Sequence, residues 1–125
     1  MIEIKNLTKR FGDLTAVDDI TLAIPDGQFF GFLGPNGAGK TTTIKVITGL
    51  LRPDAGKVEI NGINIQKNPE QAKRDIGYIP DIPFFYEKLT GEECLQFVGR
   101  MYEMDESDIR NGIDEMVELF HLESY

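Results

Sequence analysis

Residues 34–41 read Gly-Pro-Asn-Gly-Ala-Gly-Lys-Thr, and their types and spacing suit the binding of a phosphate group. Glycines let a loop curl so that successive N–H groups point at one anion. Lys40 adds a cation that can reach the β- and γ-phosphates of a nucleotide. Thr41 adds a hydroxyl oxygen of the kind that Mg²⁺ prefers, and Thr42 adds a second hydroxyl that can donate to phosphate. The spacing matches the phosphate-binding loop G-x-x-x-x-G-K-[ST], which predicts nucleotide contacts for Gly34, Pro35, Asn36, Gly37, Ala38, Gly39, Lys40, Thr41 and Thr42.

A phosphate-binding loop lies between a buried strand and the start of a helix, and the sequence predicts both. Gln28 to Leu33 is a nearly continuous apolar run, which is typical of a strand buried on both faces. From Lys40 to Leu51 apolar residues recur at helical spacing, and the segment 52–56, Arg-Pro-Asp-Ala-Gly, ends that helix. A helix that begins at Lys40 directs its free N–H groups and the positive end of its dipole at the loop.

Most of the remaining first part of the chain is typical of strands joined by turns. Alternating apolar residues in 2–7 and 20–24 predict two strands. Asn61-Gly62 lies between alternating apolar residues and predicts a tight hairpin. Residues 76–79, Ile-Gly-Tyr-Ile, predict a further short buried strand, and residues 69–73 predict one turn of helix.

The last third of the chain changes to helical periodicity. Residues 90–93, Thr-Gly-Glu-Glu, form a capping box that begins a helix at Thr90. Apolar residues then recur every three or four positions along 94–102 and 109–120, which predicts two amphipathic helices. We therefore expect two parts, a core in residues 1–88 and the beginning of a helical subdomain in residues 89–125.

Composition excludes several classes of protein. The chain has 125 residues, of which 41% are hydrophobic and 27% charged, as in an ordinary globular domain. Its net charge of −8 argues against non-specific binding of nucleic acid, which needs an excess of Lys and Arg. Residues 69–125 hold 14 acidic and 5 basic side chains, which we interpret as a solvated acidic helical face.

The cysteine and the apolar runs exclude further kinds of site and segment. The single cysteine, Cys94, excludes an internal disulfide and a metal site built on paired cysteines, and we interpret it as a small apolar residue of a helix. The only histidine, His121, is expected on the last helix. No run approaches the roughly 18 apolar residues of a membrane span, and residues 1–11 do not have the pattern of a secretory signal. These features predict a cytoplasmic location.

The residues around the phosphate-binding loop point to one family. Residues 34–65 read GPNGAGKTTTIKVITGLLRPDAGKVEINGINI, and residues 2–24 read IEIKNLTKRFGDLTAVDDITLAI. Over residues 1–102 at least, the chain resembles the ATP-binding subunit of an ABC transporter, and most of all the stand-alone ATPase subunits of bacterial exporters and ABC-2-type permeases. The resemblance implies an α/β fold, with a P-loop NTPase core, an N-terminal antiparallel β-layer and the start of an α-helical subdomain.

The same resemblance implies a function. It implies ATP and Mg²⁺ as ligands, and hydrolysis of ATP by the intact protein to drive transport through separate membrane permeases. It further implies a peripheral position on the inner face of the cell membrane, and a second ATP-binding subunit that completes each ATP site.

The resemblance also assigns roles to residues outside the loop. Phe11 stands where the family has an aromatic residue, commonly tyrosine, that stacks on adenine, and Val17 would pack beside the base. Asp81 stands where the family has a glutamine that touches Mg²⁺ and the attacking water, so it is either a catalytic residue and metal ligand or an ordinary turn aspartate. The region that receives the membrane subunit would contain Pro83, Phe84, Phe85 and Tyr86, which would otherwise pack between the core and the helical part.

Several elements that catalysis in this family needs do not occur in the sequence. They are the Ser-Gly-Gly signature motif, the Walker B acids, the D-loop and the switch histidine, whose place His121 cannot take. The chain thus resembles the N-terminal half of the family's domain, ending within the helical subdomain, and we expect it not to hydrolyse ATP alone. Two alternatives stay open: a non-catalytic nucleotide-binding or regulatory module, and another P-loop enzyme such as a small-molecule kinase.

Overall fold

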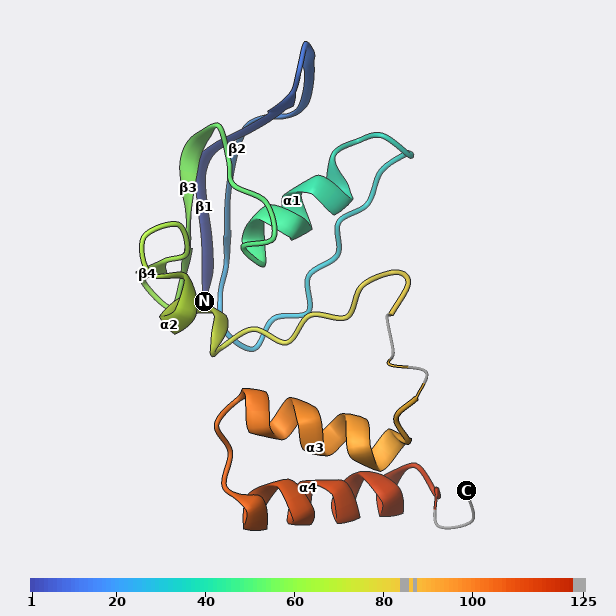
Figure 1. The fold of residues 1–125 in the computed structure, drawn as a ribbon. Helices are drawn as coiled ribbons and strands as arrows, with labels where there is room; N and C mark the ends of the chain where they lie inside the picture. Colours follow the sequence, from blue (N-terminus) through green and yellow to red (C-terminus); the bar gives the residue numbers. More distant parts are fainter. Residues whose placement is uncertain (84–85, 87, 123–125) are drawn as a thin grey trace. The chain divides into compact units, whose positions relative to one another are not determined.

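The computed structural model describes residues 1–83, 86 and 88–122 of the chain (Figure 1). The chain forms two compact units, Met1–Tyr78 and Ile79–Tyr125, each with its own packing. The domain boundary near residue 88 stays a prediction. Among the described residues, none of the helices is long and apolar enough to cross a membrane.

The first unit is built on a four-stranded antiparallel sheet with the strand order β2-β1-β3-β4. β1 (Ile2–Phe11) and β2 (Leu14–Ile24) form a long hairpin, β3 (Ala55–Ile60) pairs with the other edge of β1, and β4 (Ile63–Asn64) extends the sheet. The turn between β3 and β4 is Asn61-Gly62, whose φ angles of 50° and 79° are both positive, as a two-residue hairpin turn requires. This sheet confirms the predicted N-terminal β-layer and the predicted hairpin.

One face of the sheet packs on α1 (Lys40–Ile47), and the two together form the hydrophobic core. Ile4, Leu7 and Val58 from the sheet are almost completely buried, as is Val46 from the helix. In β3 the buried residues Val58 and Ile60 alternate with partly exposed ones, so a slip of one residue would turn this apolar pair out of the core. The core therefore fixes the register of the strands that hold the hairpin.

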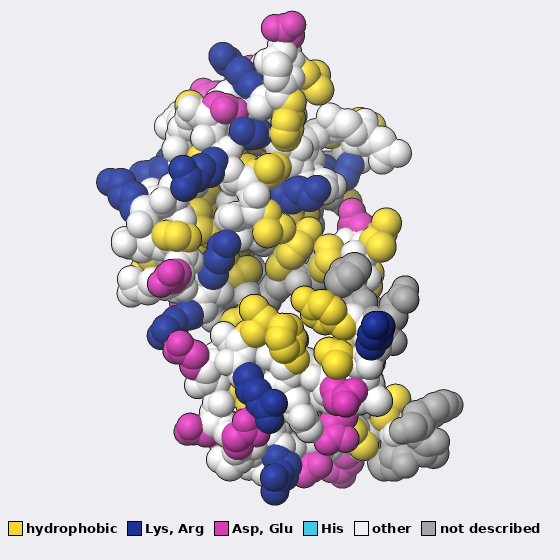
Figure 2. Space-filling view, in the orientation of Figure 1, with side chains coloured by type: hydrophobic (Ala, Val, Ile, Leu, Met, Phe, Trp, Pro, Cys, Tyr) yellow, Lys and Arg dark blue, Asp and Glu magenta, His cyan; other side chains and the backbone are white. Residues whose placement is uncertain are grey.

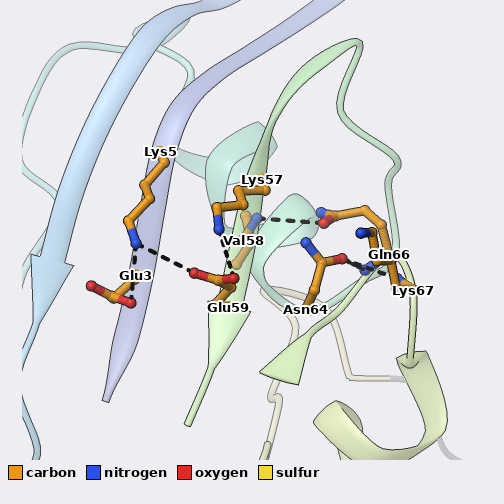
Figure 3. A network of polar contacts seen from close by, with 8 residues as sticks. All are labelled: Glu3, Lys5, Lys57, Val58, Glu59, Asn64, Gln66 and Lys67. Atoms are coloured by element: carbon orange, nitrogen blue, oxygen red, sulfur yellow. Dashed lines mark hydrogen bonds and ion pairs between the residues drawn. The ribbon is translucent and has the colours of Figure 1, made fainter. Parts of the chain in front are cut away.

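The other face of the sheet carries charged side chains (Figure 3). The Lys5 ammonium lies 3.4 Å from a carboxylate oxygen of Glu3 and 3.4 Å from one of Glu59. Lys57 lies 2.8 Å from the second oxygen of Glu59 and holds the pKa of that carboxyl below its ordinary value. These exposed pairs support the sheet only weakly, but they keep this face solvated.

The first helix begins where the sequence predicts but ends earlier. It ends at Ile47 rather than near Leu51, because Gly49 adopts a φ of 68°, which a continuing helix does not allow. The Leu50 N–H then donates to the Lys45 carbonyl at 2.8 Å and closes the last turn. The periodic apolar residues beyond this point belong to a turn and not to the helix.

Two predicted strands are wrong. Residues 28–33 and 76–79 are not assigned to any strand, and neither run pairs with another strand among the described residues. Leu33 is 95% exposed and Ile79 is 88% exposed, so these runs are not buried on both faces. An apolar run predicts burial, but a strand also needs a neighbouring strand to satisfy its backbone. The predicted helical turn does form, as α2 (Pro69–Lys73).

The second unit contains two helices, α3 (Gly91–Met101) and α4 (Glu106–Leu119), as predicted. The Glu93 N–H donates to the Thr90 hydroxyl at 3.2 Å, and the Thr90 N–H donates to the Glu93 carboxylate at 2.7 Å, which confirms the capping box. Where the helices meet, a Cβ at Gly99 would lie 2.6 Å from Ile109, so only glycine allows this approach. Acidic side chains gather over these helices (Figure 2).

The cysteine and the histidine lie in this second unit. Cys94 is half-buried in α3 and is not in a disulfide, in keeping with its interpretation as a helix residue. His121 is exposed and has a φ of 54°, and it follows α4 instead of lying within it. The prediction that His121 lies on the last helix is therefore wrong by a few residues, because the helix ends at Leu119.

Candidate functional site

A pocket of about 310 Å³ lies between the tip of the β1–β2 hairpin and the loop that precedes α1. Figure 1 shows the tip and the loop at the same end of the first unit. The hairpin contributes Phe11, Leu14 and Ala16 to its walls, and the loop and helix contribute Asn36, Gly37, Ala38, Gly39, Lys40, Thr41 and Thr42. One wall is therefore apolar, and the other consists of backbone, hydroxyl and ammonium groups.

Gly39 anchors the loop to the hairpin. It has a φ of 80°, and a Cβ placed on it would lie 2.3 Å from the Ala16 carbonyl oxygen and 3.2 Å from the Val17 side chain. No side chain fits into that space, so the loop can touch β2 only through a glycine. The close approach fixes the loop wall against the hairpin wall and so sets the width of the pocket.

Lys40 follows the last residue of the loop, and its side chain reaches back to the first residues of the loop. Its ammonium donates to the carbonyl oxygens of Gly34 and Pro35, both at 2.7 Å. The cation is therefore held beside the loop and the pocket before any anion arrives. Gly34 and Pro35 do not line the pocket themselves, and their contribution here is to position Lys40.

The three threonines that follow Lys40 divide into two roles. Thr41 and Thr42 line the pocket, whereas Thr43 is 1% exposed and its hydroxyl donates to the Gly39 carbonyl at 2.9 Å. Mg²⁺ commonly takes one or two protein oxygens and completes its shell with phosphate oxygens and water. The Thr41 hydroxyl fits that requirement. Among the residues described, no cluster of three or more His, Cys, Asp or Glu side chains could hold a metal ion.

The hairpin wall contains one predicted residue and two that the sequence did not indicate. Phe11 is 48% exposed and lines the pocket, where a base could stack on it. Val17 is 3% exposed and lies in the hydrophobic core behind Gly39, whereas Ala16 reaches the pocket. Leu14 lines it too, because it pairs with Phe11 across the hairpin turn. That cross-strand pairing is the signal that could have identified Leu14.

Charged residues lie next to Phe11. The Lys9 ammonium lies 5.4 Å from the centre of the Phe11 ring and 3.2 Å from a carboxylate oxygen of Asp54. The same carboxylate accepts the Arg10 N–H at 2.6 Å. This N–H, and then Lys9, hold the pKa of Asp54 below its ordinary value. The spacing of these residues in the sequence did not indicate this group.

The remaining predicted site residues belong to the second unit. Asp81 and Pro83 are exposed. Tyr86 is 54% exposed and packs edge to face on Phe97, with 5.6 Å between ring centres. Phe84 and Phe85 lie outside the described residues. The roles expected of these residues at the metal and at a membrane partner stay predictions.

Comparison with known proteins gives one consistent result. Residues 17–124 match the family model described as "ABC transporter". The chain is 39% identical to the bacitracin transport ATP-binding protein BcrA of Bacillus licheniformis, over 98% of this chain and 39% of that protein. It is 43% identical to the uncharacterized ABC transporter ATP-binding protein YhcH of Bacillus subtilis, over 98% of this chain and 39% of that protein.

Solved structures give the same result for the fold. A structure of the ATP-binding subunit of an ABC transporter superposes with a TM-score of 0.88 at 35% identity, over 98% of this chain and 51% of that one. A dimeric bacterial ABC transporter cassette superposes with a TM-score of 0.82 at 27% identity, over 99% of this chain and 59% of that one. These likenesses confirm the predicted fold class. The chain spans 39% of the length of each of the two curated relatives above.

Proposed function

The chain belongs to the ABC transporter family, and from this premise we propose that it binds ATP with Mg²⁺ in the pocket between the hairpin and the loop. One observation carries the proposal: a single pocket joins an exposed aromatic ring to residues 36–42, which form the second half of the predicted phosphate-binding loop and the first turn of α1. Its volume of about 310 Å³ is at the lower end of the range for small-molecule sites. An amphipathic pocket suits a ligand with an apolar base at one end and phosphates at the other.

The loop supplies the phosphate contacts. The N-terminus of α1 opens onto the pocket, and its free N–H groups and dipole favour an anion there. Lys40 exchanges its two carbonyl acceptors for phosphate oxygens, which are stronger acceptors because they are charged. Thr41 would hold Mg²⁺, which offsets charge on the phosphates when it is bound.

We propose a larger role for the intact protein. As an ABC transporter subunit it would hydrolyse ATP and drive transport through separate membrane permeases, from a peripheral position on the inner face of the membrane. A second ATP-binding subunit would complete each site. Pro83, Phe84, Phe85 and Tyr86 would contact the permease, and the exposed ring of Tyr86 supports this because aromatic side chains are common anchors at interfaces.

The direct test is calorimetric titration of ATP·Mg into the chain and two variants. Lys40→Ala removes a charge-assisted contact and should weaken binding about 10- to 100-fold. Lys45→Ala is the matched control, because Lys45 is exposed on the same helix and does not line the pocket. Equal affinities for all three proteins, or no binding by a folded wild type, would contradict the proposal.

Asp81 needs its own test. If it approaches the metal, its carboxylate repels the phosphates unless Mg²⁺ is present. We therefore expect the Mg²⁺ dependence of ATP affinity to fall in Asp81→Gln. An unchanged dependence would leave Asp81 as a turn residue.

Hydrolysis by the chain alone is not expected, since phosphoryl transfer needs a positioned nucleophile as well as the phosphate cradle. The measurement is phosphate release by freshly purified chain, with Lys40→Ala as the control for contaminating enzymes. Steady turnover of about one per second, abolished by Lys40→Ala, would show a complete catalytic site and contradict this account.

A further inference from the structure

We propose that Lys9, held in place by Asp54, is a positioning residue that orients the Phe11 ring for stacking on a purine base. This inference rests on the proposed function, since it concerns the base end of the same pocket. It assigns a role in nucleotide binding to two charged residues that do not line that pocket.

Lys9 is mostly buried and lies against the Phe11 ring. Its side chain is only 14% exposed, and its ammonium lies over the Phe11 ring, 5.4 Å from the ring centre. Phe11 lines the pocket and Lys9 does not. The cation therefore contacts the ring without lining the pocket, and it leaves the part of the ring that lines the pocket open to a ligand.

Asp54 holds the strand segment that carries Lys9. Its N–H donates to the Thr8 carbonyl at 2.9 Å, and its carboxylate accepts the Arg10 N–H at 2.6 Å and pairs with Lys9 at 3.2 Å. These three contacts fix three consecutive residues of β1, immediately before Phe11 at its end. Asp54 itself lies between α1 and β3, so it connects the helix of the phosphate-binding loop to the strand that carries the ring.

The physical effect on the ring is of two kinds. A cation over one face of an aromatic ring is attracted by its quadrupole, which restricts the tilt of the ring before a ligand arrives. The same cation draws electron density toward itself, so the opposite face repels an electron-rich base less strongly. Both effects act on a stacked purine, and neither acts on phosphates bound at the loop.

A ligand with a base and a ligand without one should therefore respond differently to the loss of Lys9. Removing the Lys9 charge should weaken ATP binding about two- to fivefold, as expected for one partly exposed cation–π contact. Binding of inorganic tripolyphosphate, which has no base, should not change. A residue that merely stabilised the fold would affect both ligands alike.

The experiment measures the affinity of the whole chain for ATP·Mg and for tripolyphosphate·Mg in matched variants. Lys9→Met keeps the aliphatic stem and removes the charge, whereas Lys9→Arg keeps the charge. Lys57→Met is the control, because Lys57 also pairs with a carboxylate on this sheet but does not line the pocket. Lys9→Met is also made in a Phe11→Leu background, and circular dichroism checks that each variant is folded.

The inference predicts that Lys9→Met weakens ATP binding alone, that Lys9→Arg restores it, and that the effect disappears in the Phe11→Leu background. If Lys9→Met is poorly folded, Asp54→Asn should produce the same ATP-specific loss, because it releases Lys9 without removing it. An unchanged ATP affinity, an equal loss for both ligands, or an equal loss without the Phe11 ring overturns the inference and leaves the proposed function intact. Failure of the wild type to bind ATP overturns both.

Discussion

The loop wall of the pocket is made by consecutive residues, 36–42, whereas the hairpin wall combines side chains of two paired strands, Phe11 from β1 and Leu14 and Ala16 from β2. In the loop wall the backbone forms much of the binding surface, and Lys40 is held by carbonyl groups of its own loop. In the hairpin wall Phe11 is half-exposed, and the Lys9 ammonium, which pairs with Asp54, lies over its ring. On the proposed assignment, one run of residues thus encodes the end of the pocket for phosphate, while the end for the base needs two paired strands.

The largest effect is expected from a substitution at Gly39 that breaks the contact between the loop wall and the hairpin wall. In Gly39→Ala the new Cβ would lie 2.3 Å from the Ala16 carbonyl oxygen in a backbone with a φ of 80°. Overpacking and the left-handed conformation together should lower the free energy of unfolding by about 2–4 kcal/mol, and ATP binding should be lost. Urea denaturation and calorimetry measure the two effects.

Gly37→Ala is the matched control for that prediction. Its φ is 84°, but a Cβ there would meet nothing within 4 Å, so only the conformational cost of about 1–2 kcal/mol should remain. Equal losses of stability in the two variants would show that the contact with β2 does not hold the loop.

A smaller effect is expected from removing the Phe11 ring from the hairpin wall. Phe11→Ala should weaken ATP binding about tenfold, because an aromatic ring that stacks on a base contributes about 1–3 kcal/mol. Tripolyphosphate binding should stay the same, since that ligand has nothing to stack. The ratio of the two affinities, measured by calorimetry, is the readout, and an equal loss for both ligands would show that Phe11 acts on the loop and not on a base.

The smallest effect is expected from Asp54, the carboxylate that pairs with Lys9. The pKa of Asp54 is held below its ordinary value by the Arg10 N–H and by Lys9, so the carboxylate stabilises the folded chain only while it is ionised. Its contribution should be complete above the ordinary value of 3.8 and should disappear as the pH falls through the lowered value. Urea denaturation should therefore separate wild type from Asp54→Asn at neutral pH, and the gap should narrow at acid pH. A gap that does not change with pH would mean that this carboxylate makes no such contribution.

The same contrast explains how much could be predicted from the sequence. The loop before α1, the start of that helix at Lys40, the hairpin at Asn61-Gly62 and the capping box at Thr90 depend on neighbours within a few residues, and all four form as predicted. The binding of phosphate by that loop stays a prediction. The ion pair between Lys9 and Asp54 joins residues far apart in the chain, and no local spacing indicates it.

The errors have related physical causes. The runs at 28–33 and 76–79 are apolar, and an apolar run favours burial. A strand, however, forms only where another strand pairs with it, and neither run has such a partner among the described residues. Helical spacing continued past Ile47, yet the left-handed conformation of Gly49 ended the helix. For Val17 the resemblance implies a place beside the base, and the structure shows that this side chain is buried in the core, so its contact with a base stays a prediction.

The measurement that tests the central claim most directly follows backbone amide signals by NMR while ATP·Mg or tripolyphosphate·Mg is added. This account predicts that tripolyphosphate shifts the signals of residues 36–42 alone, and that ATP shifts these and also those of Phe11 and Leu14. Shifts that are the same for both ligands, or that leave the loop residues unchanged, would contradict a pocket with a phosphate wall and a base wall.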